Sequence, residues 1–326
     1  MSIAVVIPYY QRTAGLLTRA LRSVLAQAGA PVARIVVVDD TSPVDAAGEV
    51  AALGDVTVPI TVVRQANAGP AAARNRGLDT LDASIRRVAF LDSDDEWEPE
   101  HLARATIALD AGHDFYFADL YQPGQTVSAF RRAGRIDGER HPPIAGADAL
   151  HAYAGDMFDQ IVRGNVIGTS TVVYDFGRFP TQRFDEAFYS AGEDYLFWIA
   201  LADAGARFCF SDRVEVRYGY GVNVYAGSGW GTDGYLRRVH NEMRYRKRLL
   251  DHRLDAGQRT FVRGKVAELR REFGLGLLHR VVERRPLDRG LLTAQLKLDP
   301  LTLLVAPIAA GSSVADRLRG RSGGAS

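Results

Sequence analysis

The sequence predicts an α/β fold with a mostly parallel central sheet, followed by a helical C-terminal region. Over the first hundred residues, apolar runs such as IAVVIP, RIVVVDD, PITVVRQ and RRVAFLD alternate with helical patterns such as TAGLLTRALRSVLAQ and GPAAARNRGLDTL. Continuous apolar strands between amphipathic helices are typical of a parallel sheet that is covered on both faces. Of the 326 residues, 47% are hydrophobic and 24% are charged, which fits a soluble globular protein and argues against disorder.

The region after the first hundred residues has a looser pattern that still predicts strands and helices. The runs DFYFADLY and STVVY predict strands, and the segments PEHLARATIAL, ADALHAYAGDMFDQIVR and GEDYLFWIALADAG predict helices. Pro99 suits the first position of the first of these helices, so that Glu96, Glu98 and Glu100 would lie near its positive end. Gly205 suits the end of the last helix.

Composition divides the chain into three expected regions, of which residues 1–220 form the α/β domain. Residues 221–235 are rich in glycine and aromatic side chains and predict a loop suited to closing over a ligand. Residues 236–326 predict basic helices that end in the apolar tail LTLLVAPIAAG. This tail is about half as long as a membrane span and contains Pro307, so we expect a buried segment or a docking surface.

The N-terminus and the single cysteine point to the cytoplasm. The segment MSIAVVIPYY has no basic region before its apolar run, which ends at Pro8, so it predicts a strand and not a signal peptide. Cys209 lies in the apolar run RFCF and has no second cysteine to pair with. We therefore expect a buried structural thiol.

Charge is distributed unevenly along the chain. The segment from Leu236 to Gly290 has 16 basic and 7 acidic residues, a net charge of +9, whereas the rest has 24 basic and 32 acidic residues, a net charge of −8. The basic region is suited to an anionic membrane surface, where each Lys or Arg adds about 1 kcal/mol, or its helices simply pack on the first domain. No module of interleaved basic and aromatic residues is evident, so we expect no nucleic-acid partner, and a homodimer is left open.

Polar residues collect where the predicted parallel strands end. In such sheets, ligands bind outside the carboxyl ends of the strands, so four strand ends are expected to meet at one crevice. The residues concerned are Pro8 to Tyr10 after the first strand, Asp39 to Ser42 after the second, Asn67 to Gly69 after the third, and the acidic run from Asp92 to Glu100 after the fourth.

Asp92 and Asp94 are the candidate metal ligands within this acidic run. Alternate residues of an extended chain point the same way, so both carboxylates are expected on one side of the turn. Two such oxygen donors suit Mg²⁺ or Mn²⁺ shared with a diphosphate. The alternative is a loop of solvated acids without a metal.

Five motifs together resemble those of the inverting family 2 glycosyltransferases. They are VVIPYYQR, VVDDTSPVD, NAGPAAARNRGLD, FLDSDD and GEDYLFW, they occur in this order, and they lie within residues 2–220. The resemblance implies the nucleotide-sugar-binding α/β fold called GT-A. The stretch VVIPYYQRTAGLLTRALRSVL is most similar to members that extend bacterial exopolysaccharide repeat units, including glucosyltransferases of the succinoglycan type. The resemblance implies a UDP-sugar donor, with UDP-glucose as the first candidate, and a glycan or lipid-linked oligosaccharide acceptor at the inner face of the plasma membrane.

The same resemblance places a set of residues around the nucleotide. Asp40 is expected to accept a hydrogen bond from the uracil ring, although an Asp after a strand is also an ordinary turn or cap residue. Gly69 lets the backbone come close, and Arg74 supplies charge-assisted donors unless it lies on a solvated helix face. The full set is Pro8, Tyr10, Asp40, Thr41, Asn67, Gly69, Arg74, Asp92 and Ser93.

The resemblance also assigns the chemistry of transfer. Asp94 is implied to bind the metal, Mn²⁺ or Mg²⁺, with Asp92 on the ribose or completing the metal shell, so that charge on the departing diphosphate is neutralised. A single displacement with inversion needs a base on the opposite face of the sugar. Asp194 is implied to be this base, with Glu193 orienting the acceptor or the base. The alternative is that both are first-turn acids favoured by a helix dipole.

The acceptor side is less specified. Thr169 and Ser170, in GNVIGTSTVV, lie where the family lines its acceptor pocket, and Trp230, in GSGWG, is expected either to stack on a sugar or to be buried against the following helix. After EVRY the family often carries a histidine that reaches the metal or diphosphate, but this chain has Gly219 to Asn223 there. His240 is a candidate substitute, and a satisfied surface histidine is the alternative.

Two other classes of function compete with this one. A nucleotide-sugar sensor would need neither a base nor a metal, so the intact DSD and GED motifs argue against it. A sugar nucleotidyltransferase would share the sheet and the Asp-bound metal, but its glycine-rich N-terminal phosphate loop is missing here. The sequence leaves the donor sugar, the acceptor, the linkage and the oligomeric state open.

Overall fold

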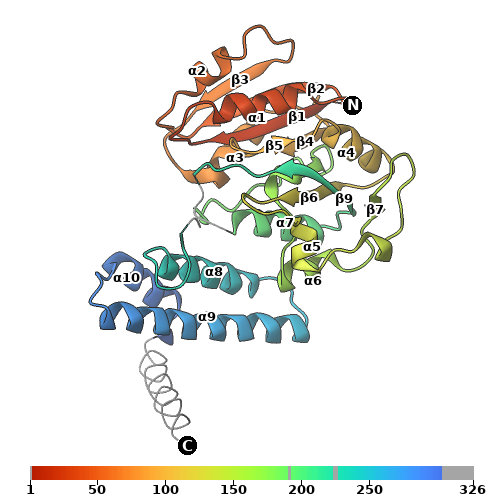
Figure 1. Ribbon diagram of the computed structural model, residues 1–326. Helices are drawn as coiled ribbons and strands as arrows, with labels where there is room; N and C mark the ends of the chain where they lie inside the picture. The colour runs from red at the N-terminus through yellow and green to blue at the C-terminus, as the bar shows by residue number, and fades with distance from the viewer. Residues whose placement is uncertain (1, 190–191, 223–226, 303–326) are drawn as a thin grey trace, which may run out of the picture. The chain divides into compact units, whose positions relative to one another are not determined.

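The computed structural model describes residues 2–189, 192–222 and 227–302, and it divides into two compact units, Met1–Asn223 and Val224–Ser326 (Figure 1). The expected loop over residues 221–235 lies partly outside the described residues, as does the apolar tail beyond Thr302. Each unit is described by itself.

The first unit begins with the predicted parallel sheet. Strands β1 (Ile3–Tyr9), β2 (Val32–Asp39), β3 (Ile60–Arg64) and β4 (Arg87–Phe90) are parallel neighbours in the order β3-β2-β1-β4, with helices α1 (Leu16–Leu25), α2 (Ala46–Ala51) and α3 (Gly69–Asp79) between them. Val37 shares a buried cluster with Leu17 of α1, whereas Val38, on the other face of β2, packs with Ala73 of α3. Both faces are therefore covered, which explains why the strands read as continuous apolar runs.

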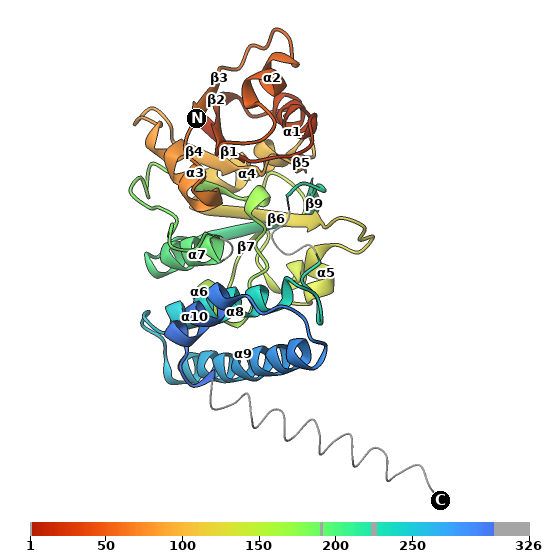
Figure 2. The same cartoon turned by 90° about the vertical axis from the view of Figure 1, so that its left-hand side faces the viewer.

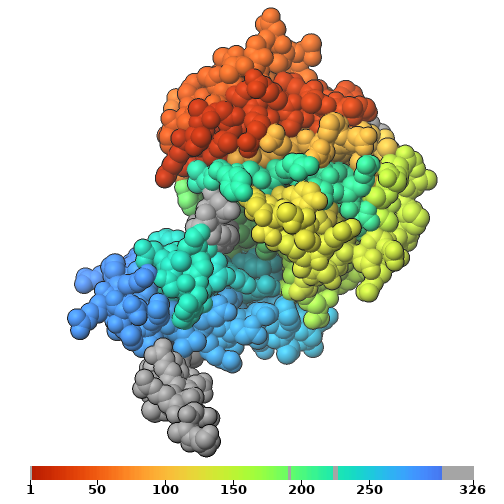
Figure 3. All heavy atoms as spheres, viewed as in Figure 1, coloured from red at the N-terminus to blue at the C-terminus, as the bar shows by residue number. Residues whose placement is uncertain are grey.

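The sheet continues through the second half of this unit with mixed polarity. Strand β8 (Val173–Asp175) is antiparallel to both β4 and β6 (Phe115–Tyr121), and the long strand β9 (Phe208–Arg217) is parallel to β6. The short strands β5 (Glu96–Trp97) and β7 (Leu150–Ala152) pair antiparallel with β9, which completes nine strands among the described residues. In the space-filling view, β9 lies directly against the segment that carries β5 and α4 (His101–Asp110) (Figure 3). The longest ladders are parallel, so the predicted mostly parallel α/β sheet is confirmed.

Local structure differs from the sequence-based expectations in three places. Only Met157–Arg163 (α6) of the segment ADALHAYAGDMFDQIVR is helical. The first part of the segment forms β7, and Gly155, at φ +133°, separates the two with a backbone conformation that is not helical. Thr169–Thr171 forms a 3₁₀ turn (η2) before β8 instead of a strand. Helix α4 begins at His101 and not at Pro99. The three glutamates before it form ion pairs: Glu96 with Arg19 at 2.9 Å, Glu98 with Arg217 at 2.8 Å, and Glu100 with Arg213 at 3.4 Å.

An aromatic core fixes helix α7 (Glu193–Asp203) under the sheet. Phe197 of α7 stacks on Phe184 with ring centroids 4.2 Å apart and meets Phe90 of β4 edge-on at 6.0 Å. Cys209 is buried in the cluster on the other face of the sheet, with Tyr116 and Leu102. Its thiol contacts the Phe115 carbonyl at 3.4 Å, and burial raises its pKa well above the usual value. The predicted structural thiol is confirmed.

The second unit is helical, as predicted. Helix α8 (Tyr235–Leu249) packs along α9 (Ala256–Val282), and α10 (Arg289–Leu298) follows (Figure 2). Val239 and Met243 of α8 form its buried core with Leu269 and Phe273 of α9. Asp255 begins α9 with a capping box that satisfies its first amides. No helix among the described residues has the length and apolarity needed to cross a bilayer.

Candidate functional site

Two acidic corners form the centre of the candidate site. The Asp92 corner is the turn from Asp92 to Asp95 after β4, and the Glu193 corner is the pair Glu193 and Asp194 in the first turn of α7. Arg74 of α3 joins them. Its Nη2 donates to Asp92 Oδ1 at 2.7 Å and its Nη1 donates to Glu193 Oε1 at 3.1 Å. The two corners therefore face each other across one guanidinium group.

Arg74 is buried, with 3% of its surface exposed, so the alternative of a solvated helix face is wrong. Burial alone would lower its pKa, but the charges of Asp92 and Glu193 outweigh burial and raise the pKa of Arg74. The guanidinium also lies over the Phe184 ring, 5.4 Å from its centroid. Removing one member of such a buried charged group costs about 3–5 kcal/mol, because its partners stay behind unpaired.

Asn75 fixes the segment that leads into the Glu193 corner. Its side chain exchanges two hydrogen bonds with the backbone of Phe184, at 2.8 and 3.0 Å, and donates to Glu186 Oε1 at 2.8 Å. Sequence analysis missed this residue. The signal was the run of alanines and glycines around it, because a helix with mostly small side chains packs closely on its surroundings. A polar residue on the buried side of such a helix needs a buried partner.

Asp194 has a strongly shifted acidity. Burial, and next the charge of Glu193, raise its pKa to about 7, while Arg74 opposes the rise. Its Oδ1 accepts a hydrogen bond from the Tyr195 amide at 2.8 Å, and its Oδ2 accepts one from the Thr169 hydroxyl at 3.4 Å. Burial also raises the pKa of Glu193. Both acids lie in the first turn of α7, as the helix-dipole alternative also expects, and Thr169 lies beside Asp194.

Ser170 is hydrogen-bonded to the Asp92 corner from the 3₁₀ turn η2. Its hydroxyl donates to Asp95 Oδ2 at 2.6 Å and accepts from the Asp92 amide at 2.9 Å, and its carbonyl accepts from the Trp97 indole at 2.6 Å. The side chain is completely buried, at 0% exposure, so the expectation that Ser170 contacts an acceptor is wrong. Ser93 is likewise turned inward, where its hydroxyl accepts from Gln11 at 3.0 Å.

The loop after β9 reaches the Asp92 corner with backbone amides. Gly221 donates to Asp94 Oδ2 at 2.7 Å, and Gly219 donates to Asp95 Oδ1 at 2.8 Å. A Cβ atom at Gly219 would overlap the Asp94 carbonyl, and one at Gly221 would lie 2.5 Å from Asp94 Cγ, so only glycine permits this approach. Backbone N–H groups stand where the family often carries a histidine.

The Asp92 corner fits a divalent ion. No set of three or more His, Cys, Asp or Glu side chains gathers as a metal site among the described residues. Magnesium-type sites, however, need only one or two carboxylates when phosphates and water supply the other ligands. Burial, and next the charge of Asp92, raise the pKa of Asp94, and a cation between these carboxylates would relieve that repulsion. Asp92 and Asp94 lie on a turn and not on the extended chain that the sequence analysis assumed.

Four of the expected nucleotide residues lie at the ends of two strands: Asp40 and Thr41 follow β2, and Asn67 and Gly69 follow β3. Hydrogen bonds connect the segment after β2 with the segment after β3. Asp40 accepts from the Gln65 side chain and from the Ala68 and Gly69 amides, all at 2.8 Å, and is 3% exposed. It therefore acts as the cap that the alternative described, and its contact with uracil stays a prediction. Thr41, at φ +59°, donates to the Gln65 carbonyl at 2.6 Å.

Tyr189 covers the start of α3. Gly69 has φ +86°, and a Cβ atom there would lie 2.8 Å from the Tyr189 ring, so the close approach that glycine permits is to this ring. The Tyr189 hydroxyl donates to Asn67 Oδ1, and the Asn67 amide donates to the Asp40 carbonyl at 2.9 Å. Sequence analysis did not find Tyr189, because no motif marks it.

The remaining predicted residues lie elsewhere. Pro8 pairs with Val38 inside the sheet, and the partly exposed Tyr10 follows β1. Trp230 belongs to the helical unit, where its ring lies 5.0 Å from Tyr235 with 56% of its surface exposed, so it is not buried against that helix.

His240 is engaged inside the helical unit. Its Nδ1 bonds to Gln295 Oε1 at 2.8 Å, and burial lowers its pKa. It is a satisfied histidine, but a buried one and not the surface residue of the alternative, and none of its described contacts supports a role as the substitute for the loop histidine.

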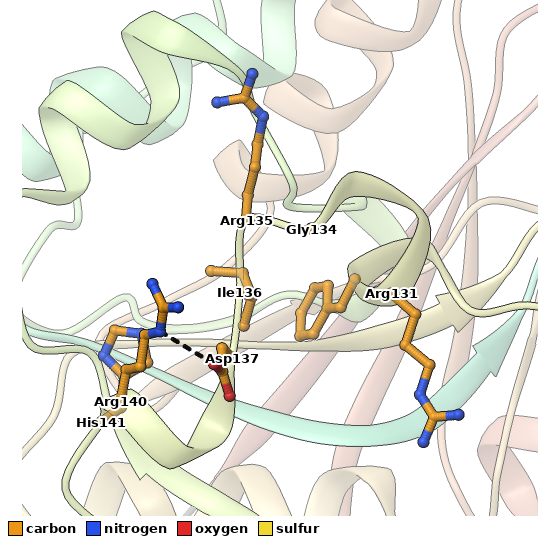
Figure 4. A pocket seen from close by; sticks show the side chains of 8 residues that line it. Arg131, Gly134, Arg135, Ile136, Asp137, Arg140 and His141 are labelled. Atoms are coloured by element: carbon orange, nitrogen blue, oxygen red, sulfur yellow. Dashed lines mark ion pairs between the residues drawn. The ribbon is translucent and has the colours of Figure 1, made fainter.

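A separate cavity of about 220 Å³ lies between α5 (Ala129–Ala133) and the 3₁₀ turn η1 (Gly138–Arg140). Figure 4 shows Arg131 and Arg135 extending in different directions from it, and Arg140 pairs with Asp137 at 3.1 Å. It is lined by no residue of either acidic corner, so we assign it no part in the site. Its lining residues are Phe130, Arg131, Gly134, Arg135, Ile136, Asp137, Arg140 and His141.

Comparison with solved structures confirms the fold that the motifs implied. S. aureus TarS 1–349 in complex with UDP superposes with a TM-score of 0.54 at 17% identity, over 97% of this chain and 88% of that one. The mannosyltransferase PcManGT from Pyrobaculum calidifontis, in complex with GDP-Man and Mn²⁺, gives a TM-score of 0.56 at 13% identity, over 94% and 84%.

Comparison with curated proteins gives closer similarity. The succinoglycan biosynthesis protein ExoW of Rhizobium meliloti (strain 1021) is 33% identical over 260 residues, which cover 76% of this chain and 80% of that protein. ExoO, a succinoglycan biosynthesis protein of the same organism, is 32% identical over 227 residues, or 66% of this chain and 59% of that protein. The sequence profile of Glycosyl transferase family 2 matches residues 4–168. With both acidic motifs in place on the expected sheet, the chain belongs to glycosyl transferase family 2.

Proposed function

We propose that the chain is a metal-dependent inverting hexosyltransferase. It moves a sugar from a UDP-sugar, with UDP-glucose as the first candidate, to a hydroxyl of a lipid-linked glycan in bacterial exopolysaccharide synthesis. The observation that carries the proposal is the pairing of both acidic corners with one guanidinium, which supports a base and a cation site that act on one sugar. The names of ExoW and ExoO support the pathway, and the UDP-GlcNAc complex of TarS supports a UDP-sugar donor.

The reaction that we propose is a single displacement. Asp194 takes the proton of the acceptor hydroxyl as its oxygen bonds to the anomeric carbon, while the bond from that carbon to the diphosphate breaks and UDP leaves with the electron pair. Glu193 orients the acceptor or the base. A divalent ion, Mn²⁺ or Mg²⁺, would be held by Asp94 with Asp92 and supplies charge neutralisation at the departing diphosphate when it is bound. Thr169, whose hydroxyl donates to Asp194 Oδ2 at 3.4 Å, is proposed to line the acceptor side.

If Asp194 is the base, its ionisation should determine the pH dependence of turnover. Asp194 must be ionised to accept a proton, so turnover is expected to be low below pH 7 and to rise through about 7, the pKa of this group. Glu193→Gln removes a negative neighbour that raises this pKa, so the rising limb is expected to move to lower pH. Steady-state rates between pH 5 and 9 on both proteins, with substrate saturating, check the direction. A limb that stays in place or moves upward would contradict the assignment.

The basic helical unit is proposed to bring the enzyme to an anionic membrane surface. We expect the full chain to sediment with vesicles that contain phosphatidylglycerol and to stay in solution with phosphatidylcholine vesicles. Because the attraction is electrostatic, sedimentation should fall as salt rises above about 0.15 M, where charges are screened beyond about 8 Å. Equal sedimentation with both vesicles, or none with either, would count against the proposal.

A donor screen tests the proposed function as a whole. A panel of UDP- and GDP-sugars is offered to the protein with and without Mn²⁺, and binding and hydrolysis of each donor are followed. We expect metal-dependent binding and slow hydrolysis of at least one UDP-sugar. Binding of a donor without any hydrolysis or transfer would favour a sensor, and binding of nucleoside triphosphate with sugar phosphate would favour a nucleotidyltransferase.

A further inference from the structure

Arg74 forms an ion pair with one carboxylate of each acidic corner. We propose that Arg74 is a positioning residue of the transfer reaction, which holds the Glu193 and Asp92 carboxylates in one fixed frame, and that it is not a ligand of the nucleotide. This inference rests on the proposed transferase function and assigns a role inside that site.

Protein groups contact the guanidinium at both terminal nitrogens and on one face. Nη1 donates to Glu193 and Nη2 donates to Asp92, while Nε is buried with no hydrogen-bond partner among the described residues. Its flat face lies over the Phe184 ring. A phosphate or base that drew this group away would leave the buried Glu193 carboxylate and the partly exposed Asp92 carboxylate without their counter-charge.

The planar fork of arginine explains why this residue type stands here. Asp92 lies on the turn after β4 and Glu193 begins α7, so their carboxylates come from elements that are 101 positions apart in the chain. A guanidinium presents its two terminal nitrogens at a fixed spacing and angle, and so holds two carboxylates at a fixed separation. A lysine ammonium is a single point charge on a flexible stem, and holds them less well.

The anchoring of Arg74 itself is rigid. The next residue, Asn75, binds the Phe184 backbone through both its amide oxygen and its amide nitrogen. Helix α3 packs so closely on the sheet that a Cβ atom at Gly77 would overlap Val6. The position of the Arg74 side chain, and of the two carboxylates that it binds, is therefore fixed relative to the sheet. Displacing a reacting group by about 1 Å can reduce turnover about 100-fold, so the frame is expected to matter for catalysis.

The chain offers a matched control in the same motif. Arg76 lies two residues further along α3, carries the same charge, and is exposed without an ion pair in the described structure. Arg74→Met and Arg76→Met are similar changes on one helix, and only the first removes the frame.

The test separates positioning from nucleotide binding. We expect Arg74→Met to lower kcat about 100-fold, whereas UDP affinity measured in EDTA stays within about 3-fold of the unmodified protein. Arg74→Lys, which keeps the charge but loses the fork, should recover only part of kcat, and Arg76→Met should match the unmodified protein. A loss of UDP affinity of about 10-fold or more with kcat retained, as expected for a lost charge-assisted contact, would overturn the proposal.

A second pair of variants covers the case in which Arg74→Met does not fold, because it leaves two carboxylates without their partner. Glu193→Gln removes one of those charges, so Arg74→Met/Glu193→Gln should fold. If Arg74 acts through Glu193, adding Arg74→Met to Glu193→Gln should reduce kcat much less than 100-fold. A further full 100-fold loss would contradict the proposal. Turnover of the unmodified protein is measured alongside: its absence would refute the proposed function, whereas its presence together with full activity of Arg74→Met would refute this inference alone.

Discussion

Asp194→Asn is expected to abolish transfer while nucleotide binding remains. The amide is nearly isosteric with the carboxylate and can still accept the hydrogen bond from the Tyr195 amide, so the first turn of α7 should keep its structure. It cannot take a proton, and loss of a general base typically costs about 10²- to 10⁴-fold in rate. Transfer assays beside titration calorimetry with UDP and Mn²⁺ measure the two properties separately.

The control for this variant lies on the same helix. Asp203 is exposed at the last position of α7, so Asp203→Asn changes the charge of the helix without touching the site and should keep full activity. Transfer by Asp194→Asn at the unmodified rate would remove Asp194 as the base. A parallel loss of UDP binding would show that the side chain acts on the donor instead.

Asp94→Asn is expected to remove the gain in UDP affinity that Mn²⁺ provides. The amide oxygen can keep the hydrogen bond from the Gly221 amide, so the turn should survive, but the charge that attracts the cation is gone. Transfer should fall about 10²- to 10³-fold, which is typical when stabilisation of a developing negative charge is lost. Calorimetry with UDP in the presence of Mn²⁺ and in EDTA gives the metal-dependent part directly.

Glu100→Gln is the matched control in the same acidic run. Its side chain is mostly exposed and pairs loosely with Arg213 at 3.4 Å, so its loss should leave both the metal effect and transfer unchanged. If Asp94→Asn retained the full effect of Mn²⁺, the ion would have to bind elsewhere.

The sequence predicted the sheet because each strand carries its own signal. The runs of β1 to β4 are apolar on both faces, which indicates buried parallel strands. Their order cannot be read from these runs, because α3 leads from β3, at one edge of the sheet, to β4 beside β1. The helix predicted before Met157 was wrong, because its apolar spacing also suits a strand, and only pairing with β9 decides between them. Helix α4 starts late because ion pairs with distant arginines, and not a helix end, satisfy the glutamates before it.

The site was predictable as motifs but not as contacts. Asp92, Asp94, Glu193 and Asp194 stand out as acids at element ends, which local sequence shows. The partners of Arg74 and Ser170 come from parts of the chain far away in sequence, and no local pattern states which buried polar groups meet. The sequence around Gly221 predicts only a flexible loop, because glycines are common in such loops. In the structure, the missing side chain lets the Gly221 amide reach the Asp94 carboxylate.

The central claim is that the two acidic corners act on one sugar from opposite faces. A crystal structure of the Asp194→Asn variant with Mn²⁺ and an intact UDP-sugar tests it most directly, because the variant should bind the donor without consuming it. We predict an anomalous manganese peak at the Asp94 carboxylate, with the side chain at position 194 facing the anomeric carbon on the side away from the diphosphate. Manganese bound away from Asp94, or a sugar whose anomeric carbon faces away from position 194, would contradict the account.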